Sequence, residues 1–459
     1  MSLSYQKELP VFRKVDVVVA GAGPAGIGAA VAAARNGAKT LVFEAHGCIG
    51  GMGTSGMVSP FMTSYDTGCE RMIIRGVFEE LVDRMVKIGG AVDPRDVRNE
   101  QPYASYFHIG HNNVTPFDPH AFKLIGMRML RESGAELLLQ TQFIDVIKNG
   151  DRITGVVIAN KDGLSVIEAK IVIDCTGDAD VAARAGVEYI MGNEEDGNLQ
   201  PASMFMRIGG ANMNVVNAHM REHSHEIRPF FGPYSWLIKE YAEDWGDFPR
   251  GEICVFADVT PGEFSINCSR ILNIDATKAE DLTRATMIGQ EQCQHIFNFL
   301  KKHAPGFENA RLISTADAIG IRETRHIAGE YKLTGEEVAA CKVHADAIAC
   351  MATNMDTHNK KDPGGSFFIP KNGPYFTVPY RCLVPKGISN LLVAGRAISA
   401  DAIAGSAIRM MPSCMAFGQA AGTAAAMAAA QSIAPKELDV QLLRHTLVQQ
   451  GQFVGEEAD

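Results

Sequence analysis

Three glycines near the start of the chain have the spacing of a loop that binds a pyrophosphate. Gly21, Gly23 and Gly26 form G-x-G-x-x-G directly after an apolar run and at the start of an alanine-rich stretch. The first glycine permits a sharp turn, the second lets backbone amides approach phosphate oxygens, and the third lets a helix pack closely on a sheet. Glu44 ends the next apolar run, where a carboxylate accepts hydrogen bonds from a ribose and repels the extra phosphate of NADP. These residues predict a dinucleotide site made of Gly21, Gly23, Pro24, Ala25, Gly26, Glu44 and Ala45, although a glycine turn before a helix in an unrelated fold shares part of the pattern.

Further segments suit a dinucleotide that continues past its pyrophosphate toward a flavin ring. A second glycine-rich loop follows Glu44, and two more motifs follow predicted buried strands. Pro412 suits the first turn of a helix, so the free amides after it could stabilise negative charge on a reduced flavin. Ordinary helix capping uses the same residues. The predicted FAD contacts in these segments are Gly50, Gly51, Met52, Thr54, Thr176, Gly177, Gly395, Arg396, Ser413, Cys414 and Met415.

Candidates for substrate chemistry lie in two later segments. Arg322, Arg325 and His326 share one short stretch, and Arg409 directly precedes the predicted flavin helix. Arginines near a flavin can orient a carboxylate, and a histidine can accept a substrate proton as a hydride leaves for flavin N5. A structural network of these arginines with nearby glutamates explains the same residues.

The sequence contains no evident metal-binding motif and no evident motif of a catalytic nucleophile. Ten cysteines are scattered without a C-x-x-C pair, which fits neither a disulfide framework nor a zinc site. His108 and His111 stand one helical turn apart, but the surrounding glycine and asparagines favour a loop. We find no G-x-S-x-G, P-loop or paired zinc-ligand motif, and we predict non-covalent FAD and no metal.

The elements that must position these residues alternate between strand and helix. Residues 15–44 have the pattern of a strand, a helix and a second strand, which a right-handed crossover makes parallel to the first. A helix is predicted over residues 77–88 and another from residue 119. Turn signals at residues 148–151 and 161–163 then separate strands of a small β-meander, which precedes a final buried strand over residues 171–175.

Length and composition divide the chain into two domains. A chain of 459 residues exceeds what one hydrophobic core usually serves. Residues from about 195 to 375 are richer in aromatic and charged side chains, whereas the later apolar run and small-residue helix resemble the first unit. We predict an α/β fold in which residues 1–195 and 376–459 form a Rossmann-like FAD-binding domain, a parallel sheet with an inserted β-meander. Residues 196–375 then form an α+β substrate domain.

The charge balance limits the classes of partner. The formal net charge of -10 argues against nucleic acid, because a phosphate backbone attracts basic surfaces. The first residues lack the apolar core of a secretory signal, and no stretch has the length and apolarity of a membrane span. We expect a cytoplasmic protein with a small-molecule substrate and an electron acceptor or donor; a homodimer is compatible with this fold.

The motifs together resemble one known family. The segments DVVVAGAGPAGIGAA, GGMGTSG, IVIDCTGDADVAARAG and NLLVAGRAISADAIAGSAIRMMPSCMAFGQAAG are similar to those of FAD-dependent oxidoreductases with the glutathione-reductase-type flavin fold, shared with fumarate reductase and aspartate oxidase. The resemblance spans residues 15–430. It implies that Phe143 meets the adenine through its backbone and that the Gly395 segment lies beside the ribityl chain. His326 stands where this family more often has arginine, so its catalytic role would be specific to this chain, or the histidine is merely a tolerated substitution.

Three functions remain open at the level of sequence. The leading hypothesis is a dehydrogenase or oxidase that transfers a hydride from a small polar substrate to FAD, because only one dinucleotide motif is found. The second is a reductase of an activated double bond, and the third is a flavin-binding module without turnover. Sugars, polyols, hydroxy acids and amines all remain candidate substrates.

Overall fold

The larger sheet is built on the strand–helix–strand unit predicted from the sequence. The computed structural model describes residues 3, 6–194, 197–227, 232–358, 366–368, 370 and 372–455. In it, β1 (Val11–Ala20) leads through α1 (Pro24–Arg35) to β2 (Thr40–Phe43), and the two strands pair in parallel. β6 (Gly163–Asp174) lies parallel to β1 on its other side, with β17 (Leu391–Val393) parallel to β6 and β3 (Glu136–Leu138) parallel to β2. This mixed α/β architecture with a parallel-rich sheet confirms the predicted fold class.

The predicted meander joins the same sheet, with one difference in detail. β4 (Gln142–Asn149) and β5 (Arg152–Asn160) pair antiparallel, and β5 pairs antiparallel with β6. The separate final strand predicted over residues 171–175 is wrong, because β6 is one continuous strand of 12 residues. Its first part lies between β5 and β1, and its end adjoins β17. No turn residue interrupts the run from Leu164 to Asp174, so the strand continues.

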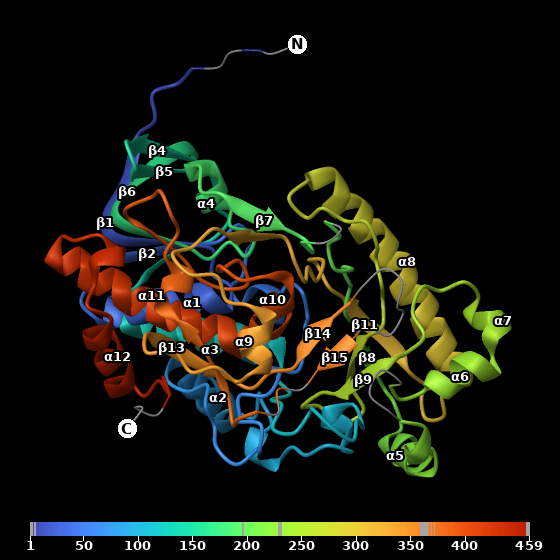
Figure 1. Cartoon of the computed structure of the whole chain (residues 1–459). Helices are drawn as coiled ribbons and strands as arrows, with labels where there is room; N and C mark the ends of the chain where they lie inside the picture. The colour runs from blue at the N-terminus through green and yellow to red at the C-terminus, as the bar shows by residue number, and fades with distance from the viewer. Residues whose placement is uncertain are drawn as a thin grey trace.

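The two faces of β1 enter different cores. Val17 and Val19 contribute to the core shared with α1 and α11 (Met411–Gln431), whereas Val18 and Ala20 contribute to the core beneath β5 and α4 (Asp180–Ala185). Successive side chains on a strand point to opposite faces, so the apolar end of β1, residues 17–20, must be covered on both sides. Figure 1 shows α1 and α11 side by side against the sheet.

Small residues let α11 lie directly on α1. A Cβ atom on Gly418 would stand 2.0 Å from the carbonyl oxygen of Ala25, and one on Gly422 would stand 2.1 Å from that of Ala29. Any side chain at these two glycines would push the helices apart. The resemblance between the two alanine-rich helices therefore reflects a close mutual contact.

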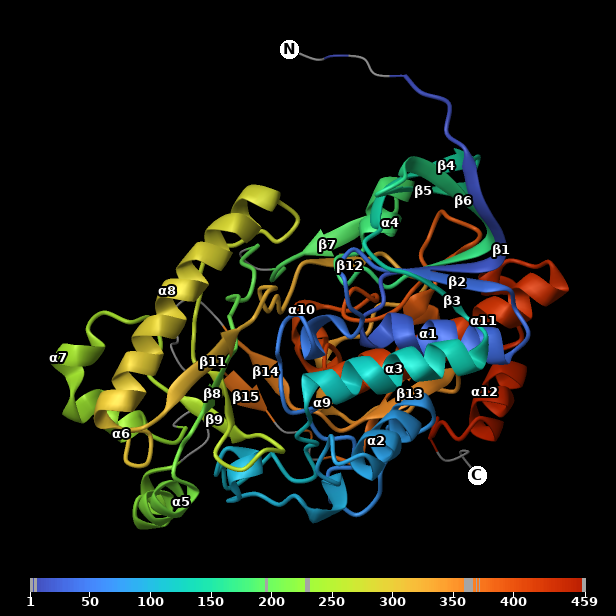
Figure 2. The same ribbon diagram turned by 180° about the vertical axis from the view of Figure 1, so that it is seen from behind.

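A second sheet forms a separate hydrophobic core. Its strand order is β11-β8-β10-β9, all antiparallel, and α8 (Ala279–His303) contributes to the same core, apart from the parallel sheet in Figures 1 and 2. Leu333 and Ile348, from the segment predicted as substrate domain, belong instead to the core of α1 and α11. The domain boundaries stay a prediction. The strands of this sheet are β8 (Met206–Gly209), β9 (Cys254–Ala257), β10 (Phe264–Asn267) and β11 (Arg311–Thr315).

The remaining elements cover these sheets or connect them. None of the described helices is long and apolar enough to cross a membrane. The remaining helices and strands are α2 (Val77–Lys87), α3 (Pro119–Ser133), β7 (Tyr189–Met191), α5 (Met213–Glu222), α6 (Ser235–Glu240), α7 (Ala242–Trp245), β12 (Arg325–Ile327), α9 (Gly335–Ala339), β13 (Ala347–Met351), β14 (Met355–Thr357), β15 (Ser366–Phe368), β16 (Phe376–Pro379), α10 (Ala402–Ile408) and α12 (Val440–Gln449).

Candidate active site

One cavity of about 800 Å³ joins the parallel sheet to the second sheet. Its first end lies at the carboxyl ends of β1, β2 and β6, where ligands of open α/β sheets bind. Its other end is lined by residues of β9, β10 and β14. The cavity therefore has room for an elongated ligand, with chemically different walls at its two ends.

The turn after β1 separates two kinds of glycine. A Cβ atom on Gly26 would lie 1.8 Å from the carbonyl oxygen of Gly21, so this glycine serves the close packing of the turn on α1. Gly23 lines the cavity, and a Cβ atom there would meet only the Cα atom of Gly51 at 4.0 Å. A methyl group on Gly23 would thus occupy cavity space beside the N-terminus of α1. That space fits a pyrophosphate, which the helix N-terminus attracts.

Glu44 is fixed at the same end of the cavity. Its buried carboxylate accepts hydrogen bonds from the backbone amides of Ala22 at 2.8 Å and His46 at 3.0 Å. These bonds tie the end of β2 to the glycine turn and present the remaining carboxylate lone pairs to the cavity. The geometry fits the predicted role of Glu44 as an acceptor for ribose hydroxyls.

Most of the predicted cofactor residues line this cavity, and the others support its walls. Thr54, for example, donates its hydroxyl to the carbonyl of Ile49 at 2.6 Å and so closes its own loop. Those that line the cavity are Gly21, Gly23, Pro24, Ala25, Glu44, Ala45, Gly51, Met52, Phe143, Thr176, Gly177, Gly395, Arg396 and Cys414. Those that do not are Gly26, Gly50, Thr54, Ser413 and Met415.

Asp178 has a clear role in this region but was not among the predicted contacts. Asp178 lines the cavity, accepts a hydrogen bond from the Thr324 hydroxyl at 2.7 Å, and pairs with the guanidinium of Arg396. It orients Arg396 from the segment after β17. The acid directly after Thr176 and Gly177, at the end of a buried strand, was the available signal in the sequence.

The second end of the cavity gathers buried charges from distant parts of the chain. Arg409 donates to the side-chain carbonyl of Gln200 at 2.8 Å and to the Asp356 carbonyl at 2.9 Å, and lies 3.4 Å from the Asp356 carboxylate. The Nε2 atom of His358 lies 3.1 Å from the same carboxylate. Asp356 thus stands between a guanidinium and an imidazole, and all three side chains line the cavity.

Arg322 occupies this end without a matching carboxylate. It donates to the carbonyl of Pro201 at 2.6 Å, and no carboxylate in the described part of the chain forms an ion pair with it. Burial and the neighbouring guanidiniums of Arg409 and Arg250 together lower the pKa of Arg322 to about 9, although the Asp356 carboxylate opposes this shift. The group remains protonated at neutral pH, and no carboxylate of the described residues lies within ion-pair distance of it.

The Asp356–His358 pair has a defined protonation state at neutral pH. Burial opposes ionisation of Asp356, but His358 and the guanidinium of Arg409 outweigh it and hold the pKa of this carboxyl well below its usual range. Burial lowers the pKa of His358 to about 4. A neutral imidazole, which has one nitrogen lone pair that can accept a proton, therefore lies beside an ionised carboxylate.

A third arginine at this end is already paired. The guanidinium of Arg250 lies 2.6 Å from the carboxylate of Glu252, and both side chains are buried in the cavity wall. The side-chain oxygen of Asn267 is buried without a hydrogen-bond partner among the described residues. Asn267 therefore offers an acceptor to a bound ligand. Neither Arg250 nor Glu252 was predicted, since nothing in their local sequence separates them from ordinary strand-end charges.

Two of the four predicted catalytic residues lie outside the cavity lining. His326 is buried, with Nδ1 at 3.2 Å from the carbonyl oxygen of Ile398 and its ring against Gly405. Arg325 pairs with Asp180 at 2.9 Å. Both residues thus have structural contacts, although Arg325 pairs with Asp180 and not with a nearby glutamate. Arg322 and Arg409 do line the cavity.

Comparison with known proteins gives one match over nearly the whole chain. The family model described as FAD dependent oxidoreductase matches residues 16–447. Two curated relatives match a shorter part of the chain, and both are thiamine thiazole synthases. The protein from Pyrococcus furiosus is 27% identical over 182 residues, which are 38% of this chain and 62% of that protein. The protein from Methanococcus maripaludis (strain C7) is 33% identical over 172 residues, which are 36% and 56% of the two chains, so the match spans less than two thirds of either relative.

Solved structures with a similar arrangement cover almost all of the chain at low sequence identity. A geranylgeranyl bacteriochlorophyll reductase-like protein from Thermoplasma acidophilum has a TM-score of 0.47 and 14% identity, and the alignment covers 96% of this chain and 84% of that one. L-proline dehydrogenase from P. horikoshii has a TM-score of 0.45 and 13% identity, with coverages of 97% and 100%.

Proposed function

Since the chain belongs to the FAD-dependent oxidoreductase family and FAD is its cofactor, we propose that it oxidises a small anionic substrate at the Arg322–Arg409 end of the cavity. Bound FAD supplies a two-electron acceptor at its ring. The turn that contains Gly23, together with Glu44, holds the dinucleotide half. The segments after β17 and before α11, between the phosphate end and the charged end, would hold the ring.

Arg322 is the observation that carries the proposal. Its guanidinium is buried in the cavity wall without a carboxylate partner, and an unpaired buried charge is costly. A substrate carboxylate would supply the missing negative charge and form charge-assisted hydrogen bonds with the guanidinium. Arg409, which is already held by Gln200 and Asp356, extends the same positive wall. The site therefore favours an acid over a neutral sugar or polyol.

The Asp356–His358 pair is proposed to take the substrate proton. Oxidation of an alcohol or amine removes a proton from oxygen or nitrogen in addition to the hydride. The neutral imidazole of His358 can accept that proton, and the Asp356 carboxylate stabilises the imidazolium that forms. This role replaces the one that the sequence suggested for His326.

The proposal is tested by anaerobic flavin spectra of the purified holoenzyme. The protein is mixed in turn with NADH, neutral polyols and sugars, 2-hydroxy acids and amino acids. Bleaching of the flavin band by one of the acid classes, and not by NADH, supports the proposal. Bleaching by neutral compounds alone would contradict it.

A reductase remains the second candidate because of one property of the same arginine. With its pKa lowered to about 9, Arg322 releases a proton more readily than an ordinary guanidinium. It could thus protonate carbon while an activated double bond receives a hydride. Chemically reduced enzyme that is reoxidised by an unsaturated dicarboxylate, and not bleached by any hydroxy or amino acid, would establish this direction of electron flow.

A further inference from the structure

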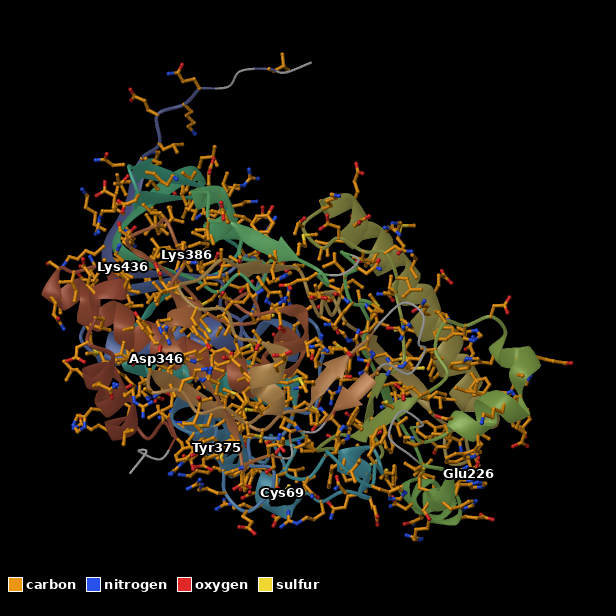
Figure 3. All side chains as sticks on the ribbon, viewed as in Figure 1. Cys69, Glu226, Asp346, Tyr375, Lys386 and Lys436 are labelled. Carbon is orange, nitrogen blue, oxygen red and sulfur yellow. The ribbon has the colours of Figure 1, made fainter. Side chains whose placement is uncertain are left out.

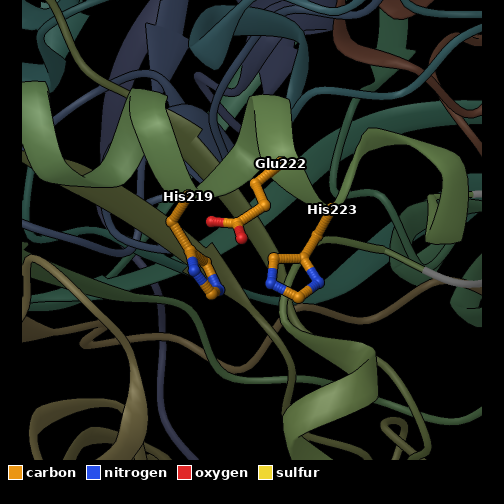
Figure 4. Close-up of side chains that lie close together, drawn as sticks. All are labelled: His219, Glu222 and His223. Carbon is orange, nitrogen blue, oxygen red and sulfur yellow. The ribbon is translucent and has the colours of Figure 1, made fainter.

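Three metal-ligating side chains converge at the C-terminal end of α5. His219, Glu222 and His223 each offer one ligand atom, and these atoms all lie within 4.8 Å of one another. Figure 4 shows both imidazole rings on the same side of the helix, with the Glu222 carboxylate between them. Residues three and four apart share one face of a helix, so the H-x-x-E-H spacing itself brings the three groups together. The sequence-based prediction of no metal does not take this spacing into account.

His223 is already oriented as a metal ligand. Its Nδ1 atom lies 2.9 Å from the carboxylate of Glu226, which follows in the 3₁₀ turn Ser224–Glu226. A ring that donates from Nδ1 to a carboxylate keeps its lone pair on Nε2. Metal-binding histidines usually have such a carboxylate on the second nitrogen, since it fixes the tautomer and raises the basicity of the ligand.

His219 has a buried nitrogen that nothing in the described chain satisfies. Its Nε2 atom is inaccessible to solvent and has no hydrogen-bond partner among the described residues. A buried ring nitrogen without a partner is explained if it binds an ion.

We propose that His219, Glu222 and His223 bind a divalent transition-metal ion, with Zn²⁺ the best match to the ligand set. Two imidazoles and one carboxylate suit Zn²⁺ because borderline-soft nitrogen donors dominate, whereas Ca²⁺ and Mg²⁺ prefer oxygen alone. The same H-x-x-E-H spacing presents zinc ligands on a helix in one class of metallopeptidases. Water completes the coordination on the open side.

The proposed ion would stabilise one wall of the cavity. Asn217 on α5 accepts a hydrogen bond from the Tyr106 hydroxyl at 2.8 Å, and the carbonyl of Ser224 lies 2.8 Å from Nε2 of His108. The same segment continues to Phe107 and His111, which line the cavity. Figure 3 shows Glu226 at this end of the molecule, far in the view from Asp346 and Lys436 beside the parallel sheet. The ion is therefore structural and separate from the flavin chemistry.

Calorimetric titration of the holoenzyme with Zn²⁺, after removal of adventitious metal, tests the site. We expect one ion per chain. His219→Ala and His223→Ala each remove a ligand, so each should weaken Zn²⁺ binding by more than the roughly 10- to 100-fold that is typical when a residue supporting a ligand is changed. Glu226→Gln changes such a supporting residue and should weaken Zn²⁺ binding by about tenfold. The matched control is His445→Ala, since His445 is an exposed helical histidine on α12 with only Gln449 as its hydrogen-bond partner here. Absence of stoichiometric binding, or equal binding by the His219 and His445 variants, would overturn the proposal.

Tryptophan fluorescence gives a second, local readout. Trp236 stacks on His223 with ring centroids 4.7 Å apart, so Cu²⁺ bound at the site should quench it. Trp236→Phe should remove this quenching and retain Zn²⁺ binding, whereas His223→Ala should remove both. Quenching that survives His223→Ala would place the ion elsewhere. Flavin content reports folding in every variant, and an inactive flavin site would leave the Zn²⁺ titration unchanged.

Discussion

The two ends of the cavity are made of different parts of the polypeptide. At the dinucleotide end, the wall is mostly backbone: glycines, amides at the start of α1, and one carboxylate that is itself held by backbone amides. At the other end, the wall consists of side chains, with the guanidiniums of Arg322 and Arg409 and the Asp356–His358 pair. A backbone wall recognises a group common to many enzymes, whereas a side-chain wall selects one substrate class.

This difference also separates the effects of substitution. At the backbone end, an added methyl group either collides with backbone atoms, as at Gly26, or occupies space needed by the cofactor, as at Gly23, so the fold or cofactor binding is affected. At the side-chain end, removal of one charge leaves the scaffold intact and changes selectivity. The predictions below test this contrast, from the largest expected effect to the smallest.

Gly26→Ala should cause the largest effect. The new Cβ atom would lie 1.8 Å from the carbonyl oxygen of Gly21, and neither segment can retreat from the sheet. We expect a loss of more than about 4 kcal/mol in the free energy of unfolding, together with loss of flavin. Urea unfolding measures it, with Gly251→Ala as control because a Cβ atom there meets no atom within 4 Å. Equal stability of the two variants would refute the close packing of the turn.

Arg322→Ala should abolish charge selectivity and leave the cofactor bound. The variant should lose roughly 100-fold in kcat/KM for an anionic substrate, about 3 kcal/mol, because the substrate carboxylate loses the guanidinium that binds it. Flavin content and stability should not fall. Arg381→Ala is the matched control, since Arg381 pairs with Asp346 at 2.8 Å on the surface. An equal loss of activity on neutral substrates would mean that Arg322 does not recognise charge.

His326 should affect acid stability and not the chemistry. Burial lowers its pKa from 6.5 to about 4, so the unfolded chain binds a proton that the folded protein excludes between these values. Its contribution to stability is complete above pH 6.5 and decreases as the pH falls toward 4, by about 2 kcal/mol at pH 5. His326→Gln should therefore show a smaller drop in unfolding free energy from pH 7.5 to pH 5 than the parent. A parallel drop in both proteins, with His445→Ala as reference, would argue against this linkage.

Gly23→Ala should weaken FAD binding with little effect on the apoprotein. Its Cβ atom would enter cavity space and touch only Gly51 at 4.0 Å. We expect about tenfold weaker binding of FAD, about 1.4 kcal/mol, because the methyl group would keep a phosphate from the backbone amides. Fluorescence titration of the apoprotein with FAD measures it. Unchanged affinity would place the pyrophosphate away from this turn.

The dinucleotide end could be predicted from the sequence because its parts are close in the chain. Gly21 and Glu44 are separated by one helix, and the crossover that brings them together has a fixed hand. The continuous apolar run of residues 17–20 is also typical of a strand that is covered on both faces. The prediction divided β6 into two strands. In the structure, the neighbour of this continuous strand changes from β5 to β17, and no residue type indicates that change.

The charged end could be predicted only in part, because its residues come from segments that tertiary packing alone brings together. Arg322 and Arg409 were identified by residue type near flavin motifs. Asp356 and His358 lie on and just after the short strand β14, and no local pattern distinguishes them from surface charges. His326 was assigned to chemistry because sequence gives the residue type and not the direction of the side chain. The H-x-x-E-H motif on α5, in contrast, depends on helical spacing alone, so the sequence is sufficient to identify it, although it was not among the predicted sites.

The central claim is that an unpaired guanidinium selects an anionic substrate for oxidation by FAD. Its most direct test compares the anaerobic rates of flavin reduction by two matched compounds. The first is the 2-hydroxy acid identified by screening, or the amino acid if that class is active. The second is its neutral analogue, in which a hydroxymethyl group replaces the carboxylate. The account predicts that the acid reduces the flavin roughly 100-fold faster, and that Arg322→Ala removes this preference. Equal rates for the two compounds, or a preference that survives Arg322→Ala, would contradict it.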